Sequence, residues 1–311
     1  MTILNGKPEA AAILLLVLTT ALVCSSGCTV PPLFGGGATE EVNLTVPVTP
    51  GTALFVQNRN GDVHLTTGNM SAVSISAVKQ TPLAQEELSL VEIIVREEEP
   101  LRVETVRARD TVQVSVDERI RIPASVAVDT VSTTNGDIVL AGTGGDARLI
   151  TSNGNITATG AGVVLARTSN GQVAVTDTTG DLAATSTNGG ITLRNVTGYV
   201  SAVTSNAEIA IQNPGGIDTI RSTNARISAD IPAIRDNVSV TTSNGDIRLK
   251  IAPDLNATIV AGTSGGRIVA TDLPITVEET GETTLQGRLG SGGATITILT
   301  SNGDIVLSPL P

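Results

Sequence analysis

The sequence predicts an all-β protein whose main part is a β-solenoid, a stack of parallel coils with two short strands in each coil. The first observation is a repeated turn word, TSNGDI, at residues 242–247 and again at 300–305. The second is the alternation of apolar and polar residues between such words, which is typical of half-buried strands. The third is that aromatic residues make up only 1% of the chain, so Ile, Val, Leu, Ala and Thr must fill thin β-layers.

The turn asparagines set the period of the repeat. Seven of them follow one another at steps of 18, 17, 18, 18, 18 and 20 residues, which fits a coil of two six-residue strands and two turns. Asn-Gly favours a type I′ turn with positive φ at both residues, and stacked side-chain amides can form a hydrogen-bonded ladder. A further turn word surrounds Asn60. The expected structural Asn ladder consists of Asn135, Asn153, Asn170, Asn188, Asn206, Asn224, Asn244 and Asn302.

The positions around each Asn indicate which side chains face inward. The third and fifth residues after the Asn are apolar in almost every coil, for example Ile138 and Leu140, while the residue between them is mostly polar or small. Two residues before each Asn stands a Thr or Ser, such as Thr151, on the expected inner side of the other strand. A Gly lies near the middle of most coils, as at Gly145, and marks the second turn.

Both ends of the array differ from the repeat. Residues 42–130 predict a β-rich N-terminal cap that includes a first repeat, one short helix around Gln85 to Leu88, and a strand from Leu90 to Arg96. Residues 131–308 contain the solenoid repeats and a C-terminal cap in the irregular stretch 272–299. Caps are expected because the ends of a solenoid would otherwise pair with other chains.

The first residues predict export. Residues 1–27 resemble a lipoprotein signal peptide, with the apolar run AAILLLVLTTALV followed by Ser25-Ser26-Gly27-Cys28. We expect Cys28 to carry acyl chains such as palmitate and to anchor the chain to the membrane, with 28–41 as a flexible tether. Cys24 leaves with the signal, and Thr29 favours the outer membrane. The alternative is a plain signal peptide with an incidental Cys.

Charge and residue types restrict the partners. The net charge of −11 argues against nucleic acid, and no cofactor is expected. Asn-Gly-Asp suggests calcium-binding β-rolls, but carboxylates are rarely found in adjacent coils of the sequence, so no metal site is expected. His64 has no second His or Cys partner and is expected to point outward from a strand. No catalytic residue is expected, although a carboxylate pair assembled across coils stays open.

The order of these motifs resembles a known group of proteins. NGDV, the strand SAVSISAVK, a short helix, RIPASVAV, serial NGD words and a terminal GSGGATITILTSNGDI are similar to the bacterial putative-adhesin β-strand repeat family of unknown function. The resemblance covers about residues 42–308 and implies a β-solenoid at the cell envelope with no established catalytic residues.

We therefore expect a non-catalytic adhesion or interaction module that is lipid-anchored at the outer membrane or cell surface and binds an unknown protein or glycan. A periplasmic scaffold or envelope-stress accessory protein is the alternative. A β-helix polysaccharide lyase or hydrolase is a distant alternative, since sugar grooves usually carry aromatic platforms and the chain has no Trp.

Overall fold

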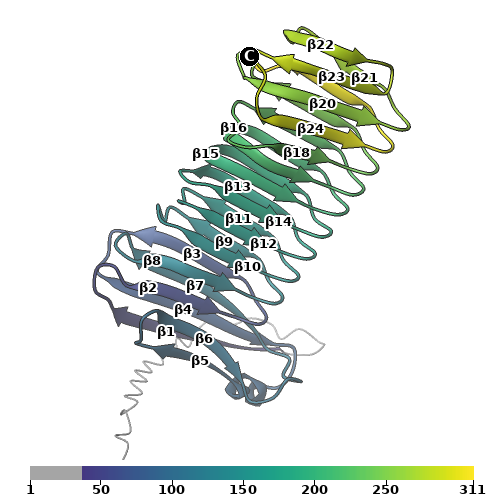
Figure 1. The fold of residues 1–311 in the computed structure, drawn as a ribbon. Coiled ribbons are helices and arrows are strands. Elements are labelled where there is room, and N and C mark those ends of the chain that lie inside the picture. Colours follow the sequence, from purple (N-terminus) through teal and green to yellow (C-terminus); the bar gives the residue numbers. More distant parts are fainter. Residues whose placement is uncertain (1–36) are drawn as a thin grey trace, which may run out of the picture.

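The computed structural model describes residues 37–311. The signal peptide 1–27, Cys28 and residues 29–36 of the tether 28–41 lie outside the described residues. The prediction of a flexible tether is wrong for residues 38–41, because they belong to strand β1 (Ala38–Pro47), which pairs with another strand. The described chain is an elongated all-β stack with one 3₁₀ helix, so the predicted fold class is confirmed (Figure 1). Among residues 37–311, no helix has the length and apolar character needed to cross a membrane.

The middle of the molecule is a regular array of parallel strands on two faces. Face one consists of the strands that follow each turn Asn, and face two of the strands that precede it. β15 and β16 are each 13 residues long and run from face one through the second turn to face two. The strands of this array are β8 (Ala127–Ser132), β9 (Ile138–Ala141), β10 (Ala147–Ile150), β11 (Ile156–Thr159), β12 (Val164–Arg167), β13 (Val173–Thr178), β14 (Leu182–Thr185), β15 (Ile191–Val203), β16 (Ile209–Arg221), β17 (Ile227–Ile231), β18 (Val238–Thr241) and β19 (Ile247–Ile251).

The N-terminal cap mixes parallel and antiparallel pairs. The helix predicted around residue 86 is the 3₁₀ helix η1 (Gln85–Leu90), and the predicted strand after it is β5. β4 pairs with both β1 and β7 in antiparallel orientation, and β5 pairs with β6 in the same way. The strands of the cap are β1 (Ala38–Pro47), β2 (Ala53–Gln57), β3 (Val63–Gly68), β4 (Ala72–Thr81), β5 (Val91–Arg96), β6 (Leu101–Arg107) and β7 (Ser115–Pro123).

The C-terminal end is closed by a hairpin and by the last coil. β22 pairs antiparallel with β23, which in turn pairs antiparallel with β20. The strands of this end are β20 (Ala257–Thr263), β21 (Ile268–Ala270), β22 (Ile275–Thr280), β23 (Thr284–Leu289), β24 (Thr295–Thr300) and β25 (Ile305–Pro309).

The spatial order of the coils departs from the order of the sequence at both ends. The coil β2–β3 stacks directly on β8–β9, and β6–β7 lies on its other side. At the other end, the last coil β24–β25 is inserted between β18–β19 and β20–β21. These two insertions join turn words that are far apart in the sequence, namely Asn60 with Asn135 and Asn244 with Asn302.

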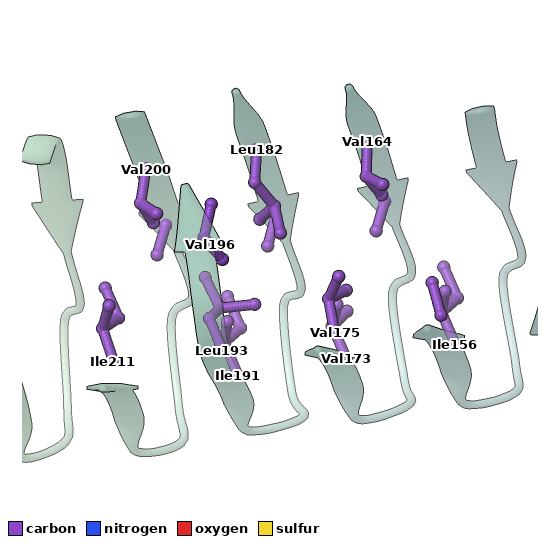
Figure 2. Packing of buried hydrophobic residues seen from close by; sticks show 14 of the residues in the cluster. Ile156, Val164, Val173, Val175, Leu182, Ile191, Leu193, Val196, Val200 and Ile211 are labelled. Carbon is purple, nitrogen blue, oxygen red and sulfur yellow. The ribbon is translucent and has the colours of Figure 1, made fainter. Parts of the chain in front are cut away.

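The core is a continuous apolar layer between the two faces. Figure 2 shows Val164, Leu182 and Val200 of face two directed toward the apolar side chains of face one. The inward columns predicted from the sequence are buried along the array, and Ile138, for example, is 0% exposed. The Thr and Ser residues two positions before each Asn are buried as well. Small inward residues such as Ala166 and Ala184 let the faces approach closely.

The predicted type I′ geometry of the Asn-Gly turns is wrong. None of the ladder Asn residues has a positive φ, and of the Gly residues that follow them only Gly61 does. The repeat requires Gly for a different reason, the close approach of adjacent coils. A Cβ at Gly171 would lie 1.7 Å from the Gly154 carbonyl oxygen, and a Cβ at Gly154 would lie 1.8 Å from that of Gly136.

Candidate functional site

The turn asparagines form one column along the edge of the stack. Each side-chain amide donates a hydrogen bond of 2.6–2.9 Å to the amide oxygen of the Asn in the neighbouring coil toward the N-terminal cap. The structure brings together all eight expected residues and adds Asn60. The order is Asn60, Asn135, Asn153, Asn170, Asn188, Asn206, Asn224, Asn244 and Asn302.

Each end of this ladder has a defined boundary. Beyond Asn302 the equivalent position is Gly265, which has no side chain to continue the column. At the other end, the Asn60 amide lies against the Arg107 guanidinium. If that amide is turned over, its oxygen accepts from Arg107 Nη2 at 3.1 Å.

A second column of polar groups lies just inside the first. The buried Thr or Ser two residues before each Asn donates its hydroxyl to the carbonyl of the residue after the turn Asn in the neighbouring coil, as Thr168 Oγ1 does to Gly154 O at 2.9 Å. Thr151 and Ser186 make the same contact at 3.0 and 2.9 Å. Ser222 is the exception, because its buried hydroxyl has no partner. The equivalent residue is Ala207, which replaces the usual Gly, but this replacement does not explain the missing bond, because Thr242 donates to the carbonyl of Ala225 at 3.0 Å.

The Asp of the NGD word also has a structural role. Asp62 Oδ1 accepts the backbone N–H of Asp137 at 2.8 Å, and Asp137 Oδ1 accepts that of Asn155 at 2.7 Å. The expectation that adjacent coils rarely both offer a carboxylate fails here, because the insertions place Asp62 beside Asp137 and Asp246 beside Asp304. Within residues 37–311, however, no group of three or more His, Cys, Asp and Glu side chains is arranged to hold a metal ion.

A third column was missed by the sequence analysis. It lies at the far end of the face-one strands, where the chain adopts positive φ at Gly142, Gly160, Asp177, Asn195 and Asn213. Asn195 donates to Asp177 at 2.8 Å, and Asn213 donates to Asn195 at 3.1 Å. The signal was present, since these residues follow the same steps of 18, 17, 18 and 18. Only Gly, Asn and Asp adopt this backbone conformation at low cost.

One charged cluster spans several coils. Arg235 donates to Asp181 at 3.0 Å and, with Nε, to Asp218 at 2.9 Å, and its guanidinium lies 4.3 Å from the centre of the Tyr199 ring. The Tyr199 backbone N–H and the Arg235 guanidinium hold the pKa of Asp181 below its usual range. The cluster fastens successive coils to one another.

Glu118 is the unusual ionisable group of the cap. Its side chain is 0% exposed and neither carboxylate oxygen has a hydrogen-bond partner. In the sheet register it pairs with Val63, which pairs with Ile138, so it occupies a column that other coils fill with Ile or Val. Burial raises the pKa of Glu118 to about 8, so this acid is mostly protonated at neutral pH.

The sole histidine and two surface hollows lie at the N-terminal end of the described chain. His64 lies on the outer side of β3 and is only partly covered. Two surface hollows near the N-terminal cap, one beside β1 and one beside the end of β3, are lined by no ionisable side chain among the described residues. The described polar columns are used in contacts between coils, and the outward side chains of the two faces lie at the surface.

Comparison with known proteins adds a family. The family model Toastrack DUF4097 matches residues 23–308. No curated protein matches the chain.

The chain is also similar to solved structures. A putative adhesin from Bacteroides fragilis has 11% identity and a TM-score of 0.40, over 87% of this chain and 97% of that one. A putative adhesin from Parabacteroides merdae has 10% identity and a TM-score of 0.30, over 86% and 96%. A putative cell adhesion protein from Clostridium sporogenes has 10% identity and a TM-score of 0.23, over 87% and 100%.

Proposed function

The chain belongs to the Toastrack DUF4097 family, and we propose that it acts as a non-catalytic interaction module on the bacterial cell envelope. The stiff solenoid presents its two faces to a ligand and holds them away from the membrane. Acylated Cys28 anchors it, and the residues between Cys28 and the start of β1 at Ala38 link the anchor to the solenoid.

The use of the polar residues carries this proposal. Catalysis needs polar groups that are free to contact a substrate, whereas the Asn, Thr and Asp columns of this solenoid contact one another. The Asn ladder alone runs through nine coils without a break. Such a stack offers regular, extended faces, which are suited to binding other molecules over a large area.

Export and anchoring are supported by the sequence alone. An apolar run of signal-peptide length ends at Ser25-Ser26-Gly27-Cys28. The chain contains only two Cys, and Cys24 precedes the proposed cleavage site. A mature exported chain would then carry a single Cys at its first position, where acylation uses it.

Protease shaving of intact cells tests the location. An epitope tag is placed after Pro311, and surface protease is added to whole cells and to cells with an opened outer membrane. We expect loss of the tag from intact cells and release of the Cys28→Ala variant into the soluble fraction. Protection of the tag until the outer membrane is opened would contradict surface exposure and favour the periplasmic scaffold. A membrane-bound Cys28→Ala variant would contradict the lipid anchor.

A further inference from the structure

The outward side chains of face two form a surface without carboxylates, which we call the Arg face. It spans six strands, namely β10, β12, β14, β15, β16 and β18. Its three charged members, Arg148, Arg167 and Arg221, are all exposed. The complete set is Arg148, Ile150, Leu165, Arg167, Ala183, Thr185, Ser201, Val203, Thr219, Arg221, Ser239 and Thr241.

This surface contrasts with the charge of the whole chain. The chain has a net charge of −11, yet residues 131–251 contain nine acidic and eight basic residues. Most acidic residues of this stretch lie in the turns, as Asp137 and Asp146 do, and Asp218 at the border of the Arg face is already paired with Arg235. Asp129 on the neighbouring strand β8 is the bulged residue at its other border. Acidic edges therefore flank a basic strip.

The three guanidinium groups have no acidic partner. Within residues 37–311, none of Arg148, Arg167 and Arg221 forms an ion pair or a side-chain hydrogen bond. Two arginines on face one differ in this respect, since Arg194 donates to Gln212 and Arg248 donates to Asp246. The donors of the Arg face are therefore available to a ligand.

The arrangement of these donors is set by the strand register. Arg148 lies beside Leu165, and Ile150 lies beside Arg167, so the two arginines alternate with aliphatic side chains across β10 and β12. Arg221 occupies the same column as Arg167, three coils further along. At the usual distance between strands this places the two residues about 14 Å apart along the axis. The positive charges thus follow the long axis of the stack.

We propose that the Arg face binds a linear anionic polysaccharide, whose carboxylate or sulfate groups pair with Arg148, Arg167 and Arg221. This inference deepens the proposed interaction function and rests on it. The polymer lies along the stack axis because the acidic turns repel it from both edges. The hydroxyl groups of Thr185 and Thr219 lie on the same surface and hydrogen-bond to the sugar.

The same residues argue against other ligand classes. Neutral glycans are usually held by aromatic stacking, and none of the twelve residues of the Arg face is aromatic. Stable protein partners usually bury large anchoring side chains, most often aromatic ones and arginines, in pockets, whereas the side chains that surround the three arginines of this face are small or aliphatic. Charge is the main recognition element that the face offers, and bidentate Arg contacts suit carboxylate and sulfate.

The proposal is tested by measuring the binding of polygalacturonate to the full chain, which is expressed and processed in its bacterial host and then purified. We expect binding at 20 mM NaCl that weakens at least tenfold at 500 mM, because exposed ion pairs are screened by salt. The triple variant Arg148→Gln, Arg167→Gln, Arg221→Gln is expected to lose at least tenfold in affinity. Its thermal unfolding should match that of the unchanged chain, since all three side chains are exposed.

Arg194→Gln is the matched control, because Arg194 is an exposed arginine of the same array on the opposite face. We expect it to bind within twofold of the unchanged chain, and we expect uncharged dextran not to bind at all. Equal binding by the triple variant, or equal loss in Arg194→Gln, would overturn the assignment to this face. Poly-glutamate that competes as well as polygalacturonate would overturn the polysaccharide class in favour of an acidic polypeptide.

The binding assay and the shaving experiment can fail separately. A tag that is accessible on intact cells, combined with absent polygalacturonate binding, would overturn only the inference about the Arg face. A chain that binds polygalacturonate in solution but is protected in intact cells would overturn the surface location and leave the ligand class standing.

Discussion

The regular array and the N-terminal cap solve the same problem, the burial of a β-face, with different residues. In the array, the column after each turn contains Ile or Val at 0% exposure, and every Thr or Ser two residues before a turn Asn except Ser222 donates its hydroxyl to a carbonyl. In the cap, Glu118 occupies that column with two unpartnered oxygens. The cap also divides its core, because Val63 belongs to the main apolar cluster and Val116 to a separate one.

This difference shows how a repeated stack is brought to an end. Each coil of the array offers the next one the same ladder of amides, hydroxyls and apolar side chains, so addition of coils can continue. Glu118 and the antiparallel strands β4 and β5 interrupt that template. The stability cost of a buried acid is thus located where a further parallel coil must not be added.

Replacing Glu118 by Ile should have the largest effect, because it makes the cap resemble the array. An unfolded Glu loses its proton above about pH 4.5, while the folded residue keeps its proton up to about pH 8. The folded state therefore binds more protons in this window, and the free energy of unfolding falls as pH rises through it. By pH 8 the free energy of unfolding of the unchanged chain has fallen by a total on the order of 5 kcal/mol. This is an upper figure because the structure can relax.

Chemical denaturation at pH 5, 7 and 9 checks this expectation. The unchanged chain should lose stability across the series, and Glu118→Ile should be most stabilised relative to it at pH 9. Glu92→Gln removes an exposed carboxylate of the same cap and should leave the pH dependence intact. A chain whose stability is the same at pH 5 and 9 would contradict a buried, unpartnered acid. The inward cation Lys79 on β4 does not neutralise Glu118, because it is paired with Glu40 at 3.2 Å.

Gly171→Ala tests the tight stacking of the array. The added Cβ would lie 1.7 Å from the Gly154 carbonyl oxygen, so the coils must shift, at a cost of about 1–3 kcal/mol. Gly145→Ala is the control, because its Cβ would meet only Thr143 O at 3.9 Å, and it should be neutral or slightly stabilising. Thermal unfolding of both variants measures the difference, and equal melting temperatures would refute close approach as the reason for Gly.

Asn188→Ala removes two hydrogen bonds from the interior of the Asn ladder, one donated to Asn170 and one accepted from Asn206. We expect a loss of about 1–2 kcal/mol. Asn302→Ala removes only one bond and should cost about half as much. Urea unfolding gives both values, and a larger loss for Asn302 would indicate that the amides contribute little compared with other contacts of the last coil.

Two serines of the hydroxyl column provide the finest comparison. Ser186 donates to Gly171 O and accepts from Gly189 N, both at 2.9 Å, whereas Ser222 has no partner. Ser186→Ala should cost about 1 kcal/mol, and Ser222→Ala should be neutral or slightly stabilising. If the two substitutions change the midpoint of denaturation equally, the hydroxyl contacts between coils do not contribute to stability.

The sequence predicts the array well because its signal is repeated. The 18-residue period and the alternation at Ile138 and Leu140 predict the two faces and the inward columns. Stacking order is less accessible, because it depends on contacts across 75 residues for Asn60 with Asn135 and 58 residues for Asn244 with Asn302. A local sequence pattern does not indicate which coils become neighbours when they are so far apart along the chain.

The candidate site was only partly predictable for a related reason. The eight ladder asparagines follow from the period, but the Arg face depends on which charged residues lack partners, and ion pairs such as Arg235 with Asp181 span 54 residues. Glu118 stands at an apolar position of the alternation that includes Val116 and Ile120, so its burial could have been inferred. Its lack of partners required the fold.

The position of the last coil has a mechanical consequence. β25 is held by parallel ladders on both sides, to β19 and to β21, and β24 is held likewise by β18 and β20. A tensile load on residue 311 therefore cannot peel one edge strand from the end of the stack. It must open two ladders together, from the interior of the C-terminal part, so the molecule resists unravelling from its free end.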